Sequence, residues 1–162
     1  MSDLNPYANF LDGRPVLDIL ADTPRAITSL LETMGAAKAH EAPAPGKWSP
    51  GEIIAHLADC ELVFAFRLRQ TLAEDSPTIQ PFDQEKWAAT YKSIEPAEAF
   101  AAFSAFRKWN LVLLETTLPA AADRPVTHPE RGTMTFQTIV ETMAGHDLNH
   151  LGQLQRIAAK SA

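Results

Sequence analysis

Apolar residues recur at helical spacing in four stretches of the chain, and segments rich in proline and glycine separate these stretches. The first stretch starts at Asp22, an N-cap candidate that stands two residues before Pro24. It continues to Met34, and Gly35 is a plausible stop. We expect residues 15–21 to form a short helical turn that leads into this helix.

The second helix has the strongest start signal. Ser49 and Glu52 have the spacing of a capping box, with proline at the first helical position, and apolar residues then continue to about Ala73. Residues 75–92 contain two prolines and two aromatic residues. This segment is too long for a tight hairpin, so it predicts a long crossover.

The third helix is predicted to start near residues 93–95 and to carry apolar residues to Leu118. Three prolines predict irregular chain over 119–132, and the fourth helix starts at 133–135 and runs almost to the end. Alternating apolar and polar residues never persist beyond a few positions, so little strand is expected. The pattern predicts a single domain over residues 1–162, an all-α four-helix bundle with a long crossover between helices two and three.

Composition agrees with one soluble domain, because 162 residues with 46% hydrophobic and 21% charged positions are ordinary for a globular chain. Fourteen Lys and Arg against 20 Asp and Glu give a net charge of −6, which argues against nucleic-acid binding. No apolar stretch approaches the ~20 residues of a membrane span, and no signal peptide is recognisable, so we expect a cytoplasmic protein. The single cysteine excludes an internal disulfide framework.

The fourth helix contains an anomaly in its expected inward-facing seam. Three consecutive positions of this seam are polar, although the spacing of steps of three and four is typical of buried apolar residues. Burying such groups without partners costs about 1–3 kcal/mol each. A bound metal ion would compensate for them. The seam consists of Ile139, Met143, His146, His150, Gln153 and Ile157.

His146 and His150 lie four residues apart, so their imidazoles face the same side of a helix and can reach one ion. His56, on the apolar side of the second helix, can complete a three-histidine site with an open position if the two helices are neighbours. The alternative is that these are core histidines that hydrogen-bond the backbone. A protease of the His-Glu-x-x-His type, with Asp147 as its base, is disfavoured because only 12 residues follow His150.

Three segments, in this order and at these separations, resemble the DinB/YfiT-like superfamily over about residues 15–158. They are GKWSPGEIIAHLAD at 46–59, the residues 67–69, 81–83 and Trp87, and GHDLNHLGQ at 145–153. The resemblance implies a four-helix bundle that binds a divalent metal, usually nickel or zinc, through His56, His146 and His150. It also implies frequent homodimers. Relatives include thiol-dependent transferases and isomerases as well as metal-dependent hydrolases.

These observations favour a metal-dependent S-transferase in which a small-molecule thiol docks on the metal and attacks an electrophilic substrate. One alternative is a metal-dependent hydrolase that uses bound water. Another is a non-catalytic, stress-related bundle in which the metal only stabilises the fold. A fourth protein ligand would indicate such a structural metal, whereas an open position would support catalysis.

Three residues near the histidines are candidates for catalysis, each with a structural alternative. Glu52 could act as a base, but the capping box also explains it. Asp59 could orient a metal ligand or form a surface ion pair. Gln153 could bond metal-bound water or a neighbouring helix. Cys60, four residues after His56, could lie near the metal or simply be a small buried side chain.

For substrate binding, the candidates are Arg67, Arg107 and Trp87. The arginines could receive a carboxylate of the thiol, although structural salt bridges are the alternative for both. Trp87 is expected to pack the crossover on the bundle, together with Trp48 and Phe82, where they could form a pocket wall. His40 and His128 lie in predicted loops and are assigned no role.

Overall fold

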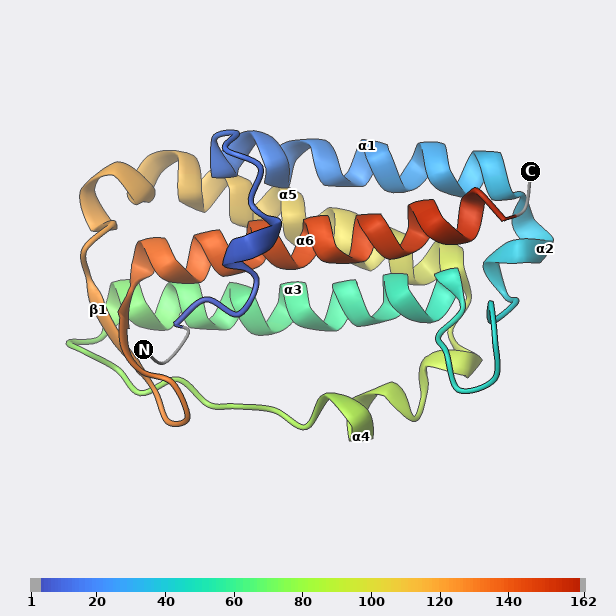
Figure 1. Ribbon diagram of the computed structural model, residues 1–162. Helices are drawn as coiled ribbons and strands as arrows, with labels where there is room; N and C mark the ends of the chain where they lie inside the picture. Colours follow the sequence, from blue (N-terminus) through green and yellow to red (C-terminus); the bar gives the residue numbers. More distant parts are fainter. Residues whose placement is uncertain (1–3, 161–162) are drawn as a thin grey trace.

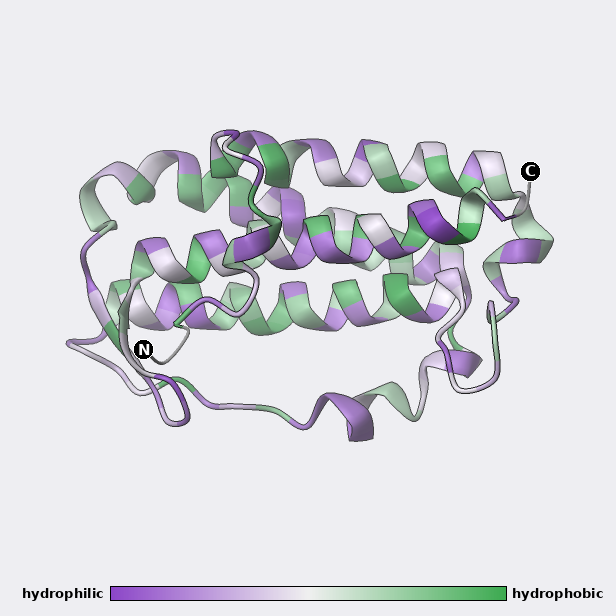
Figure 2. Cartoon of the chain, viewed as in Figure 1, coloured by the Kyte–Doolittle hydropathy of each residue, from purple (hydrophilic) through white to green (hydrophobic). Residues whose placement is uncertain are grey.

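The computed structural model describes residues 4–160 and has four long helices packed lengthwise (Figure 1). This confirms the all-α four-helix bundle. In Figure 2, hydrophobic and hydrophilic residues alternate around each long helix, as an amphipathic bundle requires. The long helices are α1 (Val16–Met34), α3 (Pro50–Ala73), α5 (Pro96–Ala121) and α6 (Phe136–Ala158).

The connection between α3 and α5 is the long crossover that the sequence predicts. Both helices run in the same direction, so the chain has to return along the length of the bundle between them (Figure 1). The returning segment contains α4 (Gln84–Ala88) and the 3-10 helix η2 (Tyr91–Ser93). In the bundle, α3 packs against α5 and α6, and α1 packs against the same two helices. Helix α3 is therefore a direct neighbour of α6.

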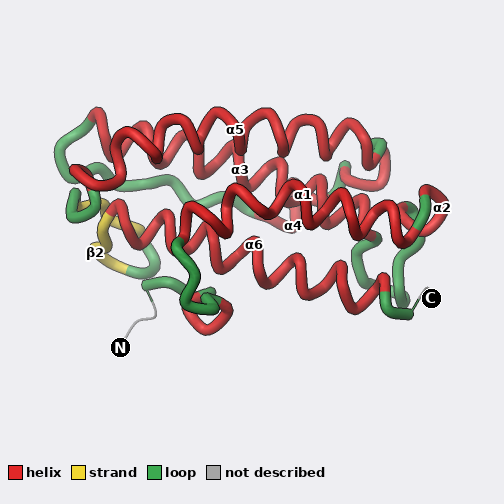
Figure 3. The backbone as a smooth tube through the Cα atoms, turned by 90° about the horizontal axis from the view of Figure 1, so that it is seen from above, coloured by secondary structure: helices red, strands yellow, loops and turns green. Residues whose placement is uncertain are grey.

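A two-stranded hairpin at one end of the bundle corrects the prediction of irregular chain before the fourth helix (Figure 3). Strand β1 (Pro125–His128) pairs antiparallel with β2 (Gly132–Thr135), and Val126 lies opposite Met134. Each strand has four residues, which is too short for apolar alternation to reveal it. The remaining short elements are η1 (Ala8–Phe10) and α2 (Ala36–Ala39).

The helix starts on either side of the histidines follow from side-chain capping. Ser49 and Glu52 form the predicted capping box, in which the Ser49 amide donates to the Glu52 carboxylate at 2.7 Å. Thr135 caps α6 by accepting from the amide of Thr138 at 3.2 Å. Local sequence therefore fixes where both histidine-bearing helices begin.

Helix α1 begins at Val16, six residues before the expected start, and Pro24 lies inside it. Proline has no amide hydrogen, so the carbonyl of Leu20, one turn earlier, loses its normal helical partner. The Arg107 guanidinium on α5 donates to that carbonyl instead, at 2.9 Å from Nη1. An interaction from another helix therefore replaces the missing bond, and sequence near Pro24 could not reveal it. Helix α5 likewise continues through Pro119, past its expected end at Leu118.

Arg107 is the centre of a buried polar layer. Its guanidinium binds Glu61 of α3 through Nε and Nη2 at 3.0 and 2.8 Å. It also binds Asp147 of α6 through Nη1 and Nη2 at 2.6 and 3.1 Å. All three side chains are 2% exposed. Asn110 donates to Glu61 at 2.9 Å, so Glu61 has a second donor.

This layer separates two apolar clusters of the core. One cluster, at the end with the hairpin, includes Leu68, Leu114 and Val140. The other, at the opposite end, includes Leu57 and Phe103. Between them every long helix contributes to the same polar contacts. Within the described residues, no helix is both long and apolar enough to cross a membrane.

Replacing the central cation tests this layer. We expect Arg107→Met to lower the free energy of unfolding by about 3–5 kcal/mol, because the Glu61 and Asp147 carboxylates would stay buried without a partner. Urea unfolding followed by circular dichroism measures the change. Arg25→Met, which removes an exposed ion pair with Asp22, is the control and should change stability by less than ~1 kcal/mol. A similar effect of both substitutions would contradict the structural role of Arg107.

Candidate metal centre

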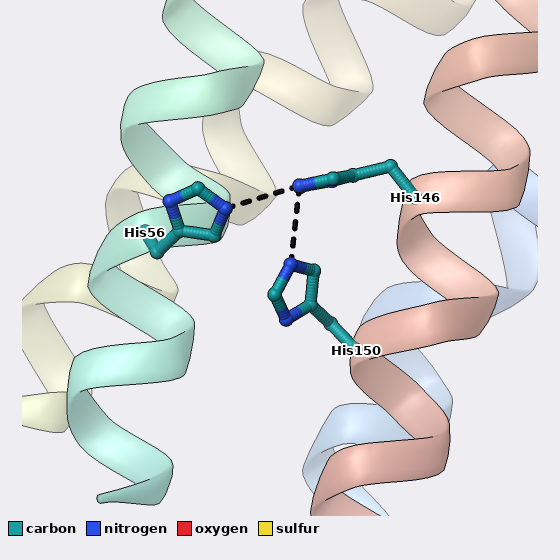
Figure 4. A group of neighbouring side chains, drawn as sticks. All are labelled: His56, His146 and His150. Carbon is teal, nitrogen blue, oxygen red and sulfur yellow. Dashed lines mark hydrogen bonds between the residues drawn. The ribbon is translucent and has the colours of Figure 1, made fainter. Parts of the chain in front are cut away.

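Three imidazoles from two helices converge between α3 and α6 (Figure 4). His56 Nε2 lies 3.0 Å from His146 Nε2, which in turn lies 3.1 Å from His150 Nε2. All three side chains are buried, with 1–5% of their surface exposed. His146 and His150 are one helical turn apart on α6, and His56 faces them from α3. The structure thus brings together the three histidines that the sequence selects.

Gln153 holds His150 in the orientation that a metal ligand needs. The His150 Nδ1 atom lies 3.1 Å from Gln153 Oε1. An amide oxygen only accepts, so Nδ1 is the donor and carries the proton. The lone pair of the neutral ring is then on Nε2, which points at the other two imidazoles. Gln153 therefore orients an imidazole of the candidate site rather than contacting a neighbouring helix.

Burial keeps the three imidazoles neutral, which is the form that binds a metal. Desolvation, with a contribution from the charge of His150, lowers the pKa of His56 to about 3. Burial also lowers the pKa of His150 to about 4, and Gln153 opposes this shift. The pKa of His146 lies well below its usual value because of burial and the two neighbouring imidazoles. At pH 7 the site presents three uncharged nitrogen donors.

The donor set fits a divalent ion. Nitrogens at ~2.0–2.1 Å from a tetrahedral ion are about 3.3 Å apart, so small movements from the observed 3.0 and 3.1 Å would admit one. Among the described residues, the three histidines form the one group of histidine, cysteine and carboxylate side chains with ligand atoms all within 4.8 Å of one another. Cys60 Sγ lies 3.5 Å from His56 Nε2 but is outside that group. Three protein donors leave a coordination position open.

Aromatic rings surround the imidazoles. Two of these rings, those of Tyr7 and Tyr91, were not predicted from the sequence. The ring of Trp48 lies 5.0 Å from that of His56, and Tyr91 packs on both. Tyr7 meets His146 edge-on at 5.0 Å. Burial raises the pKa of Tyr7, so its phenol keeps its proton at neutral pH. These rings limit the access of water to the site.

Gly145 is a sequence signal that some backbone segment passes close to α6 here, although it does not identify Tyr7 as that segment. A Cβ at Gly145, inside α6, would lie 2.5 Å from the carbonyl oxygen of Tyr7. Glycine inside a helix costs about 1 kcal/mol relative to alanine, so an interior glycine indicates a close backbone approach. The segment that leads into η1 crosses α6 (Figure 1), and the contacts of Tyr7 place this crossing beside His146.

The carboxylates proposed near the site have structural partners. Glu52 accepts the Ser49 amide in the capping box. Asp59 accepts a hydrogen bond from the Tyr91 hydroxyl at 2.8 Å and so ties η2 to α3. Neither contact places a carboxylate on an imidazole nitrogen.

Arg107 and Trp87 are not where a substrate-binding role would put them. Every nitrogen of the Arg107 guanidinium is engaged in the buried layer, so the structural salt bridges that were its alternative are present. Trp87 is 38% exposed on α4, and its ring packs on Phe82 at 4.9 Å. Trp48, not Trp87, is the tryptophan beside the histidines. Asp147, the base that a protease of the His-Glu-x-x-His type would use, instead accepts hydrogen bonds from Arg107 in the buried layer.

Arg67 and His128 lie together beyond Phe64, whose ring touches His146. Arg67 donates to the Gln80 carbonyl at 2.8 Å, so this candidate is partly engaged by the crossover. His128 is buried in β1, which corrects its assignment to a loop. His40 is exposed at the other end of the bundle, 3.7 Å from Glu95, and takes no part in the site.

Comparison with known families agrees with this geometry. The model of the DinB superfamily matches residues 19–154, a range that contains all three histidines. The chain belongs to the DinB superfamily. In this DinB-superfamily protein the matched region extends from α1 almost to the end of α6.

Relatives of this DinB-superfamily protein include chains named "Putative metal-dependent hydrolase". The one from Oceanobacillus iheyensis is 25% identical over 142 residues, which covers 87% of this chain and 83% of the relative. One from Bacillus cereus strain 03BB102 is 24% identical over 165 residues and covers 95% of each chain.

Among solved structures, YfiT from Bacillus subtilis has a similar fold. The match has a TM-score of 0.81 at 20% identity and covers 90% of this chain and 85% of YfiT. Its description reads "a probable metal-dependent hydrolase with an unusual four-helix bundle topology". At this identity the likeness shows the fold, and it agrees with the four-helix bundle described above.

The contact between Gln153 and His150 leads to a testable effect on metal affinity. We expect Gln153→Ala to weaken zinc binding about 10–100-fold, because His150 would lose the acceptor that fixes its tautomer and ring orientation. Competition with a chromophoric zinc chelator measures the affinity. Gln155→Ala, at an exposed position two residues away, should bind zinc as the wild type does. Equal affinities in the two variants would show that Gln153 does not support the site.

Proposed function

We propose that this protein is a metal-dependent hydrolase whose divalent ion, nickel or zinc, is held by His56, His146 and His150. Three neutral imidazole nitrogens converge without a fourth ligand among residues 4–160, and this is the observation that supports it most directly. The names of the relatives agree with this reaction class. Imidazole donors suit both metals, so the donor set itself does not select between them.

A divalent ion in this position supplies Lewis-acid polarisation and lowers the pKa of a water molecule at its open position. The chain contributes the arrangement around it. Neutral imidazoles leave the full positive charge of the ion in place, and Gln153 fixes the orientation of His150. Trp48, Tyr91 and Tyr7 restrict bulk water, which strengthens electrostatic interactions inside the site.

Two other functions use the same three histidines. A thiol S-transferase would place a thiol sulfur at the open position, but the relatives described above are named for hydrolysis and not for thiol chemistry. A purely structural metal would favour a closed coordination shell. Cys60 would have to close it, yet its sulfur contacts only one of the three imidazoles, that of His56.

Metal analysis combined with hydrolysis tests the proposal. Protein loaded with zinc or nickel should contain about one ion per chain and should release 4-nitrophenolate from 4-nitrophenyl acetate. His56→Ala should lose the ion and reduce hydrolysis at least ~100-fold, because two imidazoles cannot hold the metal in place. His40→Ala, which removes an exposed histidine outside the three-histidine cluster, is the matched control.

The outcomes separate the three functions. Retention of the metal by His56→Ala would refute the ligand set. Metal binding with thiol-dependent conjugation to an aromatic chloride, and no hydrolysis, would replace the hydrolase by a transferase. Metal binding with neither reaction, and loss of the metal in Cys60→Ser, would identify a structural site.

A further inference from the structure

Helix α6 finishes and α3 begins at the same end of the bundle (Figure 1), and residues of both helices line a cavity of about 660 Å³. Its size is within the range of small-molecule sites, roughly 300–1,000 Å³. Trp48, Ile53 and Ile157 supply apolar wall. Gln153 and Ile157, the last two positions of the inward-facing seam of α6, line this cavity. They are only half-buried, whereas the four seam positions before them are buried.

Two of the lining residues also contact the metal ligands. Gln153 binds Nδ1 of His150, and the ring of Trp48 packs on that of His56 at 5.0 Å. The cavity is therefore separated from the imidazoles by one layer of side chains. A molecule in it would lie beside the metal centre.

The charges of the cavity are opposite to those of the protein as a whole. Lys47, Arg156 and Lys160 line it, and the described residues of the lining include no Asp or Glu. None of the three cations has an ion pair within the described chain. All three are exposed side chains, and they lie together in a chain of net charge −6. They create a positive potential that attracts anions.

The helix dipole does not account for this arrangement. It favours cations at the C-terminal end of α6, where Arg156 and Lys160 stand. Lys47, however, comes from the loop before α3. Arg156 is also directed back along α6, because its Nη1 lies 3.4 Å from the position that a Cβ would occupy at Gly152. The guanidinium therefore lies over the last turns of α6, where Arg156 lines the cavity.

We propose that this cavity binds the substrate of the metal centre, and that the substrate is a small carboxylic acid with an apolar body. The apolar part packs on Trp48, Ile53 and Ile157, and the carboxylate pairs with Arg156 and the two lysines. This inference rests on the proposed hydrolase for its reaction, but the binding site itself does not require the metal.

Calorimetric titration of the metal-free and the zinc-loaded protein tests the inference. The probes are 4-phenylbutanoate and its neutral amide, which have the same apolar body. We expect the acid to bind at least ~10-fold more tightly than the amide, with the difference shrinking at high salt. Arg156→Gln should reduce the affinity for the acid about tenfold and leave that for the amide unchanged.

Lys92→Gln removes an exposed lysine of the crossover and serves as the matched control; it should bind the acid as the wild type does. Equal binding of acid and amide, or equal losses in Arg156→Gln and Lys92→Gln, would overturn the inference. Acid binding without metal-dependent hydrolysis would refute the proposed function and leave the anion site intact. Hydrolysis of neutral esters, together with equal binding of the acid and the amide, would refute the anion site and leave the proposed hydrolase intact.

Discussion

The fold depends on one guanidinium. Arg107 of α5 contacts a carboxylate of α3, a carboxylate of α6 and a backbone carbonyl of α1, so a single buried side chain contacts every long helix. Burial alone would lower its pKa, but the charges of Asp147 and Glu61 outweigh this effect and the pKa is raised. Arg107 is therefore charged, and removing it would leave two buried carboxylates without compensation. Apolar packing tolerates small sliding movements, whereas paired hydrogen bonds at fixed distances do not.

The same interaction determines where the histidines meet. Asp147 directly follows His146, and Glu61 lies five residues after His56. Successive positions on a helix differ by about 100°, so when Asp147 faces the bundle axis His146 faces the groove between α3 and α6. Fixing Glu61 and Asp147 on one arginine thus fixes the register of the two helices. That register brings His56 opposite His146.

Local signals in the sequence were sufficient for the parts of the fold that short segments determine. The Ser49 capping box, the crossover and the histidine spacing all follow from neighbouring residues, and the structure has each of them. The predicted start of α1 was wrong because Pro24 lies inside the helix. Arg107, 83 residues away in the sequence, donates to the carbonyl that Pro24 leaves without a partner.

Side chains that depend on long-range packing were harder to assign from the sequence. Arg107 was considered for substrate binding because a buried arginine and a ligand-binding arginine look alike until their partners are known. Tyr7 was missed because nothing near it in sequence indicates a position over Gly145. The hairpin was missed for a different reason, since its strands are too short to show a pattern.

The arrangement of the polar layer also bears on what a metal would do here. In domains that fold only with metal, the ion supplies contacts that the chain lacks. In this protein the contacts among all four helices come from Arg107, Glu61 and Asp147, and two apolar clusters flank them. The histidines lie beside that layer and need not hold the helices together. Because these contacts between helices do not involve the histidines, a metal ion held by them would not be needed to join the helices, which agrees with the catalytic role proposed above.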